Sequence, residues 1–374
     1  MKKTIYKYFF YQFVINFTIT LFALTAIVWT VQAVNYLDLV TEDGHAFVVY
    51  FYYSLLTLSK VFTKLIPFSF LLAIILTILK FEKDSELLIL WTFGLNKIHL
   101  VNLIFRIGIL IMFLQLLLTS TFNPTLLNFS RTLLKNSEVQ FIPSLLKAKQ
   151  FNDTVEGLTI FVEKKDENNI YKNVFIRDEG TILSKIASTS STIFAKSGHI
   201  SKDEKKLILY NGNIQKLNQN GDVSIVKFQK TILNLSSIST KSIREAKMQE
   251  TSTIKILSCL FNSKINKHNC DNSKKSLMDT KIEINKRFGM PLYIILIALI
   301  SSFLLASQKD KKIFYYNKYI YFFIGFLILA LAEMIVRYSG LSFNHTLVYY
   351  LIPIIMCPLI YLALIRTFKY ENLS

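Results

Sequence analysis

Residues Glu82–His99 read EKDSELLILWTFGLNKIH, a short charged and amphipathic stretch between two long apolar runs. Asp84 or Ser85 can cap the N-terminus of a helix here, and the acidic side chains suit the positive end of its dipole. Gly94 is placed to end this helix as a left-handed residue, and Asn96 can cap whatever follows. The stretch therefore predicts a helix of about two or three turns between two membrane spans. Such a helix must either pack on its own membrane domain or offer an apolar face to something soluble.

The composition indicates an integral membrane protein. The chain has 374 residues, a mean hydropathy of +0.38 and 52% hydrophobic residues, with apolar runs at both ends. Soluble proteins rarely carry several such runs. The net charge of +18 would suggest a polyanionic partner, but lysine is enriched throughout, as in the product of an AT-rich genome. This general bias argues against nucleic acid as a partner and leaves an anionic lipid or glycolipid open.

The three cysteines predict no metal site. Cys357 lies in an apolar run and is interpreted as a packing residue. Cys259 and Cys270 could pair in an oxidising compartment, or they could be two unrelated thiols. His268 lies beside Cys270, but no second ligand pair has the spacing of a zinc site.

Apolar segments predict six transmembrane helices. The expected spans are Tyr8–Val34, Ala46–Leu79, Leu100–Phe122, Phe288–Ser307, Tyr319–Tyr338 and Leu347–Ile365. Lysine and arginine gather before the first span, after the fourth and after the sixth, which places both termini in the cytoplasm. Asn123-Pro124 is expected to close the third span on the outer side.

Between Lys147 and Met248 the pattern changes from apolar runs to alternating polar and β-branched or aromatic residues. Asn211-Gly212-Asn213 and Asn220-Gly221-Asp222 have the chemistry of hairpin turns. Short strands with regular turn signals predict an antiparallel sandwich or barrel-like sheet, external because three spans precede it. The predicted domains are 1–124 with the short helix at 84–94, the β domain at 125–250, a linker at 251–287 and the last three spans at 288–374. Within the linker, Ile254–Phe261 is a candidate amphipathic helix.

Three charged pairs are candidates for contacting a charged substrate, and each has the i,i+4 spacing that places two side chains on one helix face. They are Lys60 with Lys64 in the second span, Arg131 with Lys135 beyond the third, and Glu333 with Arg337 in the fifth. For the first pair, snorkelling to lipid headgroups and binding of anionic substrate groups are equally good interpretations. A solvated face is favoured for the second pair, and a mutual salt bridge for the third, over contact with substrate or gating.

The chain lacks the motifs of an enzyme that acts alone. No Gly-Lys pair occurs, so there is no Walker A loop to hold nucleotide phosphates. There is also no HExxH motif, no GxSxG elbow and no convincing pair of carboxylates within the spans. We therefore expect no catalytic residue, metal or cofactor, and energy must arrive through a partner or an ion gradient.

Four stretches together resemble the LptF/LptG permeases of the bacterial lipopolysaccharide export system. They are Asp84–Gly94, similar to the family pattern S-E-L-x-x-L-x-x-x-G, Leu65-Ile66-Pro67, Phe122-Asn123-Pro124, and Glu283–Pro291, similar to E-x-x-x-R-x-x-x-P. They span nearly the whole chain. Within the family, Gln32 and the stretch Phe151–Val162 look more similar to LptF.

The resemblance implies a membrane α-helical fold of six helices, three plus three, around an inserted periplasmic all-β jellyroll-like domain. It also implies a location in the bacterial inner membrane, as a heterodimer with a paralogous permease. The partners would be a cytoplasmic ABC-type ATPase dimer resembling LptB and periplasmic LptC- and LptA-like jellyroll proteins, to which lipopolysaccharide is transferred. The ATPase-coupling residues would be Ser85, Glu86, Leu87, Leu90, Trp91 and Gly94, with Leu87, Leu90 and Trp91 on one side of the helix.

Two other classes of function stay open. A secondary transporter would carry inverted repeats, broken helices and buried ionisable groups near the middle of the membrane, none of which is convincing here. A membrane-anchored sensor or scaffold would bind a ligand through the β domain and a signalling protein through the short helix.

Overall fold

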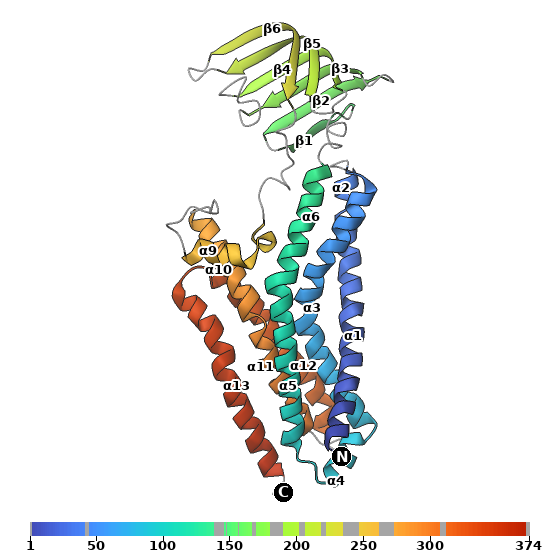
Figure 1. The fold of residues 1–374 in the computed structure, drawn as a ribbon, viewed down its shortest axis with the longest axis vertical. Helices are drawn as coiled ribbons and strands as arrows, with labels where there is room; N and C mark the ends of the chain where they lie inside the picture. Colours follow the sequence, from blue (N-terminus) through green and yellow to red (C-terminus); the bar gives the residue numbers. More distant parts are fainter. Residues whose placement is uncertain are drawn as a thin grey trace. The chain divides into compact units, whose positions relative to one another are not determined.

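The computed structural model in Figure 1 describes most of the chain. The described residues are 2–41, 45–137, 146, 148–155, 157–166, 170–179, 190–201, 206–217, 222–234, 247–261, 273–306 and 312–371. The chain divides into two compact units. A helical unit comprises residues 1–30, 57–127 and 248–374, and a second unit comprises residues 31–56 and 128–247.

Apolar helices dominate the chain, because a segment in lipid must satisfy its own backbone hydrogen bonds. The most apolar ones are α1 (Lys2–Asn35), α3 (Phe47–Lys83), α5 (Lys97–Leu117), α11 (Leu292–Ser302), α12 (Lys312–Tyr338) and α13 (Phe343–Glu371). The other α-helices are α2 (Asp38–Thr41), α4 (Glu86–Thr92), α6 (Asn123–Ser137), α9 (Thr253–Phe261) and α10 (Lys274–Gly289). Within the described ranges, five segments could cross a membrane, or six if the bent pair α10–α11 is one span. The predicted helical membrane fold is confirmed.

A proline sets the bend between α10 and α11. The two helices meet at 43°, and Pro291 is the N-cap residue of α11. Proline lacks an N–H and has a fixed φ, so it is tolerated at the start of a helix and disrupts its interior. The apolar helix therefore begins at Leu292 rather than at the predicted Phe288. Within the expected linker 251–287, α9 matches the candidate helix at 254–261, and most of α10 is an additional helix.

The third span does not close at Asn123-Pro124, and that prediction was wrong. The chain passes from α5 through a π-helical turn (Leu118–Phe122) directly into α6. Pro124 has no N–H to offer the carbonyl of Ser120, four residues earlier. That carbonyl instead accepts a hydrogen bond from the hydroxyl of Thr253. A contact distant in sequence thus lets the helix continue past the proline.

The second unit contains an antiparallel sheet of six strands in sequence order, which confirms the predicted inserted β domain (Figure 1). The strands are β1 (Phe151–Val155), β2 (Leu158–Lys165), β3 (Ile170–Asp178), β4 (Ser191–Ile200), β5 (Lys206–Leu217) and β6 (Val223–Asn234). Buried residues alternate with more exposed ones along β2, as expected for a sheet with one face in a core.

One of the two predicted hairpin turns is not a turn. Asn211-Gly212-Asn213 lies inside β5, and Asn211 has a φ of 50°. A Cβ on Gly212 would come within 2.0 Å of the carbonyl oxygen of Phe194 on β4. Asparagine and glycine are therefore used here for a kink and a close strand approach. The second predicted turn lies mostly outside the described residues, at 220–221, although β5 and β6 do pair as antiparallel neighbours.

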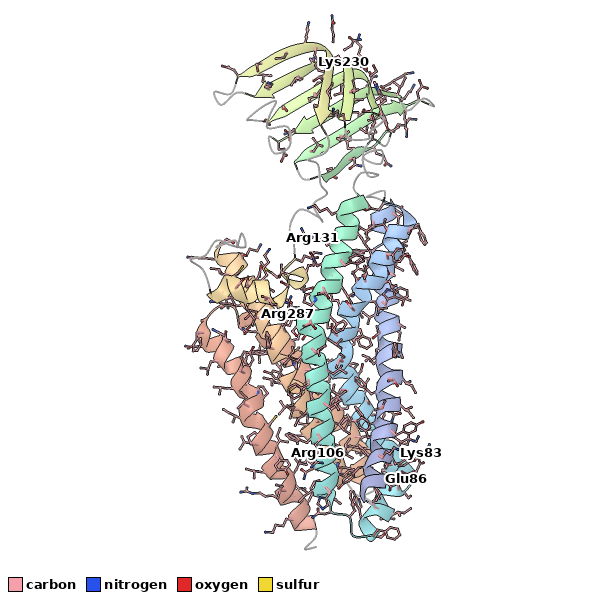
Figure 2. All side chains as sticks on the ribbon, viewed as in Figure 1. Lys83, Glu86, Arg106, Arg131, Lys230 and Arg287 are labelled. Atoms are coloured by element: carbon pink, nitrogen blue, oxygen red, sulfur yellow. The ribbon has the colours of Figure 1, made fainter. Side chains whose placement is uncertain are left out.

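The side chain of Arg287 on α10 binds the segment 248–253, where the chain re-enters the helical unit (Figure 2). It is 3% exposed. Its Nε donates to Glu283 Oε1 at 2.9 Å and its Nη1 to Thr253 Oγ1 at 2.8 Å. Its Nη2 lies 3.1–3.3 Å from the carbonyl oxygens of Met248, Gln249 and Thr251. A planar guanidinium is suited to such a set of acceptors.

Replacing Arg287 with methionine should cost about 3 kcal/mol of unfolding free energy, because it leaves the carboxylate of Glu283 and several carbonyls without their donor. Arg287→Lys should cost less than Arg287→Met, since the ammonium keeps the positive charge, although it lacks the planar set of N–H donors of the guanidinium. Denaturant titration of the detergent-solubilised chain measures both. Lys281→Met, on the exposed face of the same helix, is the matched control, and equal stability of R287M and K281M would contradict the expectation.

Candidate functional site

The helix predicted between the second and third spans is α4 (Glu86–Thr92). Gly94 has a φ of 76°, which confirms it as the left-handed residue that ends the helix. Asn96 caps α5 as predicted, since its side chain accepts a hydrogen bond from the amide of Ile98. The predicted side-chain cap of α4 is wrong, because Ser85 is the N-cap residue but has a φ of 59° and makes no side-chain cap bond. A side-chain cap requires an extended backbone, which Ser85 lacks.

One side of α4 packs on the chain's own helices. Leu87 is 5% exposed and belongs to the main core of the helical unit, and Leu90 and Trp91 pack against that core. Lys97 of α5 adds a cation–π contact, with its Nζ 5.7 Å from the centroid of the Trp91 ring. The three residues predicted to share one side of the helix therefore do so, and that side faces inward.

The other side of α4 is apolar and exposed. Leu88 is 64% and Ile89 51% exposed, and Phe93, directly after the helix, is 75% exposed. None of these three was predicted, because an apolar run around a short helix does not tell which side packs inward. Glu86 is the first residue of the helix, where a negative carboxylate interacts favourably with the positive end of the helix dipole. Figure 2 places Glu86 and Lys83 at the end of the helical unit where α1 begins.

A second candidate site joins charged side chains from three helices. Glu333 of α12 accepts a hydrogen bond from Lys286 of α10, with Nζ 2.6 Å from Oε1. The Nζ of Lys64 on α3 lies 4.0 Å from the same oxygen. The favoured salt bridge between Glu333 and Arg337 is therefore wrong: within the described chain, the carboxylate pairs with lysines of neighbouring helices, and the Arg337 side chain is exposed.

This cluster of Lys64, Lys286 and Glu333 carries one surplus positive charge. Its side chains are 63%, 33% and 24% exposed, respectively, so an anionic group can reach them. Lys286 was not predicted as a site residue, although it lies inside the E-x-x-x-R stretch that suggested the family. Spacing along the chain gives no signal for a pair formed between α10 and α12.

The structure places the other predicted basic residues as follows. Lys60 is half-buried one turn before Lys64. Arg131 and Lys135 lie on the part of α6 that belongs to the second unit, where Arg131 is half-buried and Lys135 exposed. Their proposed contacts with substrate stay predictions.

The sheet carries an aromatic row that was not predicted. Phe151, Phe161, Phe175 and Phe194 occupy one register row across β1–β4. Ring centroids lie 4.6 Å apart for the first pair and 5.1 Å for the last. The next register row, with Val162, Val174 and Ala195, is buried in the domain core. Adjacent rows point to opposite faces, so the phenylalanines occupy the face away from that core.

These rings line a hollow of about 870 Å³ together with polar side chains. Asn173 and Asn211 both lie in it and both have a positive φ, 52° and 50°. Lys196 and Lys227 are the basic residues of its lining. The hollow therefore combines an apolar floor with positive charge, a combination that suits an amphiphile with an anionic group.

The predictions for cysteine and metal chemistry concern few described residues. Cys357 is half-buried and packs against both helical cores, which confirms its structural interpretation. Cys259 is disulfide-bonded, which argues against its interpretation as an unrelated free thiol. Its predicted partner Cys270 and the neighbouring His268 lie outside the described residues, so the predicted pair itself is not tested. Among the described residues, no three His, Cys, Asp or Glu side chains gather as a metal site would require.

Comparison with known proteins identifies a family and a relative. The family model "Lipopolysaccharide export system permease LptF/LptG" matches residues 7–367. "Uncharacterized protein RP871" of Rickettsia prowazekii (strain Madrid E) is 26% identical over 236 residues, which are 63% of this chain and 64% of that protein. The chain thus spans somewhat less than two thirds of the curated relative that it matches.

The family match covers the membrane helices and the inserted sheet alike. It is to LptF and LptG jointly, so the preference for LptF stays a prediction. The family consists of transmembrane transport subunits without catalytic activity of their own. Because its model spans nearly the whole chain, the protein belongs to the LptF/LptG family, the multi-pass membrane permeases of the lipopolysaccharide export system.

Proposed function

We propose that this permease extracts lipopolysaccharide from the outer leaflet of the bacterial inner membrane and passes it through its β domain to a periplasmic bridge. It acts with a paralogous permease and is driven by a cytoplasmic ABC-type ATPase dimer resembling LptB. The bridge consists of LptC- and LptA-like jellyroll proteins. Both termini and α4 lie in the cytoplasm, and the β domain lies in the periplasm.

The observation that carries the proposal is the two-sided helix α4. Leu88, Ile89 and Phe93 remain exposed between two membrane spans. On the proposed cytoplasmic side, three large apolar side chains would face water, which indicates a protein contact. Glu86 adds a carboxylate that can pair with a basic side chain of the partner. Leu87, Leu90 and Trp91 support the helix from inside, so a force applied to the exposed side reaches the core of the helical unit.

The substrate is recognised by charge at the helices and by apolar contact at the sheet. Ammonium groups of Lys64 and Lys286 suit the phosphates and carboxylates of an acidic glycolipid. Glu333 holds the two lysines together until an anion competes for them. Acyl chains suit the hollow with the aromatic row, since phenylalanine rings offer a large apolar surface.

Removing the exposed apolar side chains of α4 should weaken binding of the ATPase. We expect Leu88→Ala with Phe93→Ala to reduce recovery of an ABC ATPase with the affinity-purified chain about tenfold or more, since interface anchors each contribute over about 1 kcal/mol. Glu86→Lys should abolish recovery. Leu341→Ala, a leucine that is 57% exposed in the turn between α12 and α13, is the control and should change nothing. Recovery of the folded native chain with no ATPase would favour a sensor or scaffold.

Reversing charge in the Lys64–Glu333–Lys286 cluster should weaken lipopolysaccharide binding. The variant Lys64→Glu with Lys286→Glu should lower photo-crosslinking to lipopolysaccharide several-fold, because like charges now meet the acidic headgroup. Added salt should reduce the difference from the wild type. Lys281→Glu, an exposed lysine of the same α10 helix, is the control. Crosslinking equal in all three proteins would return Lys64 to the role of a lipid anchor.

A further inference from the structure

Polar residues follow one face of α1 at every fourth position. They are Tyr8, Gln12, Asn16 and Thr20. Side chains four residues apart on a helix share a face, so these four form a stripe along the first half of α1. Each of them makes a polar contact with α3 or α4, and we call this set the polar ladder.

The first contact of the ladder reaches the start of α4. The hydroxyl of Tyr8 donates a hydrogen bond to Oε1 of Glu86 at 3.2 Å. The Tyr8 ring lies 5.4 Å from the ring of Phe81, at the end of α3. A carboxylate acceptor makes this a charge-assisted bond. It engages one carboxylate oxygen of Glu86, so the other can serve a partner's basic side chain.

The remaining contacts run along α3. Lys80 Nζ donates to Gln12 Oε1 at 2.9 Å, and Asn16 Nδ2 donates to Thr77 Oγ1 at 2.9 Å. The hydroxyl of Thr20 lies 3.5 Å from the carbonyl oxygen of Ser69. Hydrogen bonds between membrane helices contribute about 0.6 kcal/mol each on average. The ladder therefore sets the position of α1 with several weak bonds.

Apolar packing of α1 is confined to a narrow seam. Phe9, Phe13, Phe17 and Leu21 are buried, again at every fourth position. Within an apolar stretch of 18 residues in each helix, 17% is buried in α1 and 67% in α3. A hollow of about 320 Å³ separates the start of α1 from α4, lined by Thr4 and Ile5 on one side and Ile89 and Leu90 on the other. Polar contact, rather than dense packing, links α1 to α4 here.

We infer that Tyr8 is a positioning residue that ties α1 to the coupling helix α4 through Glu86, so that α1 follows a displacement of α4. This inference rests on the proposed coupling role of α4. The same carboxylate then meets the ATPase and the first transmembrane helix. A movement of α4 reaches α1 through the first contact of the ladder, without passing through the core that receives Leu87, Leu90 and Trp91.

Hydrogen–deuterium exchange of the full chain in nanodiscs tests the tether without any partner. Tyr8→Phe removes only the hydroxyl and should accelerate amide exchange in Glu86–Thr92 about threefold. Tyr11→Phe is the matched control, because Tyr11 is 61% exposed on another face of α1. In a Glu86→Ala background, Tyr8→Phe should add nothing, since the acceptor is already absent. Equal exchange in the two single tyrosine variants would overturn the tether.

The transport complex tests what the tether does. With the ATPase and the paralogous permease reconstituted in proteoliposomes, Tyr8→Phe should reduce lipopolysaccharide released per ATP hydrolysed about threefold while the hydrolysis rate stays within about twofold. A merely structural role would lower both together. Equal release per ATP in the Tyr8→Phe and Tyr11→Phe complexes would overturn the coupling role. If the wild-type chain binds no ATPase, the proposed function fails, while the exchange measurement still decides whether the tether exists.

Discussion

The hydrogen bonds of the buried Arg287 guanidinium hold the segment 248–253 against α10, and the rest of the helical unit depends on this contact. Proline at position 124 deprives the carbonyl of Ser120 of its helical donor, and the hydroxyl of Thr253 supplies the replacement. Thr253 is itself held by Arg287, which also binds the carbonyls of the returning chain. Thr119 closes the circuit by donating to the carbonyl oxygen of Arg287 at 3.2 Å. The same hydrogen bonds therefore support the continuous helix around Pro124 and fix the segment 248–253 against it.

The short helix α4 depends on a different constraint. Seven residues cannot hold a helix in water by local hydrogen bonds alone, so α4 needs tertiary packing to exist. Leu87, Leu90 and Trp91 provide that packing, which leaves Leu88, Ile89 and Phe93 outside. A helix anchored in this way can receive a partner without unfolding. The inward side thus makes the helix rigid, and the outward side makes it available for contact.

Local sequence patterns predicted most of the fold. The predictions that failed concern features that depend on contacts between residues distant in sequence. Apolar runs gave the spans, alternation gave the sheet, and Gly94 ended its helix as its left-handed backbone requires. Pro124 failed as a helix end because Thr253, far along the chain, satisfies the freed carbonyl. Gly212 failed as a turn residue because it serves a close approach to Phe194. Glu333 pairs with Lys286 across two helices, which outcompetes its i,i+4 neighbour.

The two kinds of link in the helical unit differ in strength, and the difference bears on transport. Arg287 makes charge-assisted bonds in a buried site, where breaking one leaves a desolvated charge and costs several kcal/mol, about 3 or more. The contacts of Gln12 and Asn16 with α3 are single bonds in a narrow seam, each exchangeable at small cost. Motion driven through α4 would therefore rearrange the contacts of α1 before it disturbed the junction at Arg287. The strong link holds α10 and the returning chain against the π-helical turn between α5 and α6, while the weak contacts leave α1 the helix most able to change position.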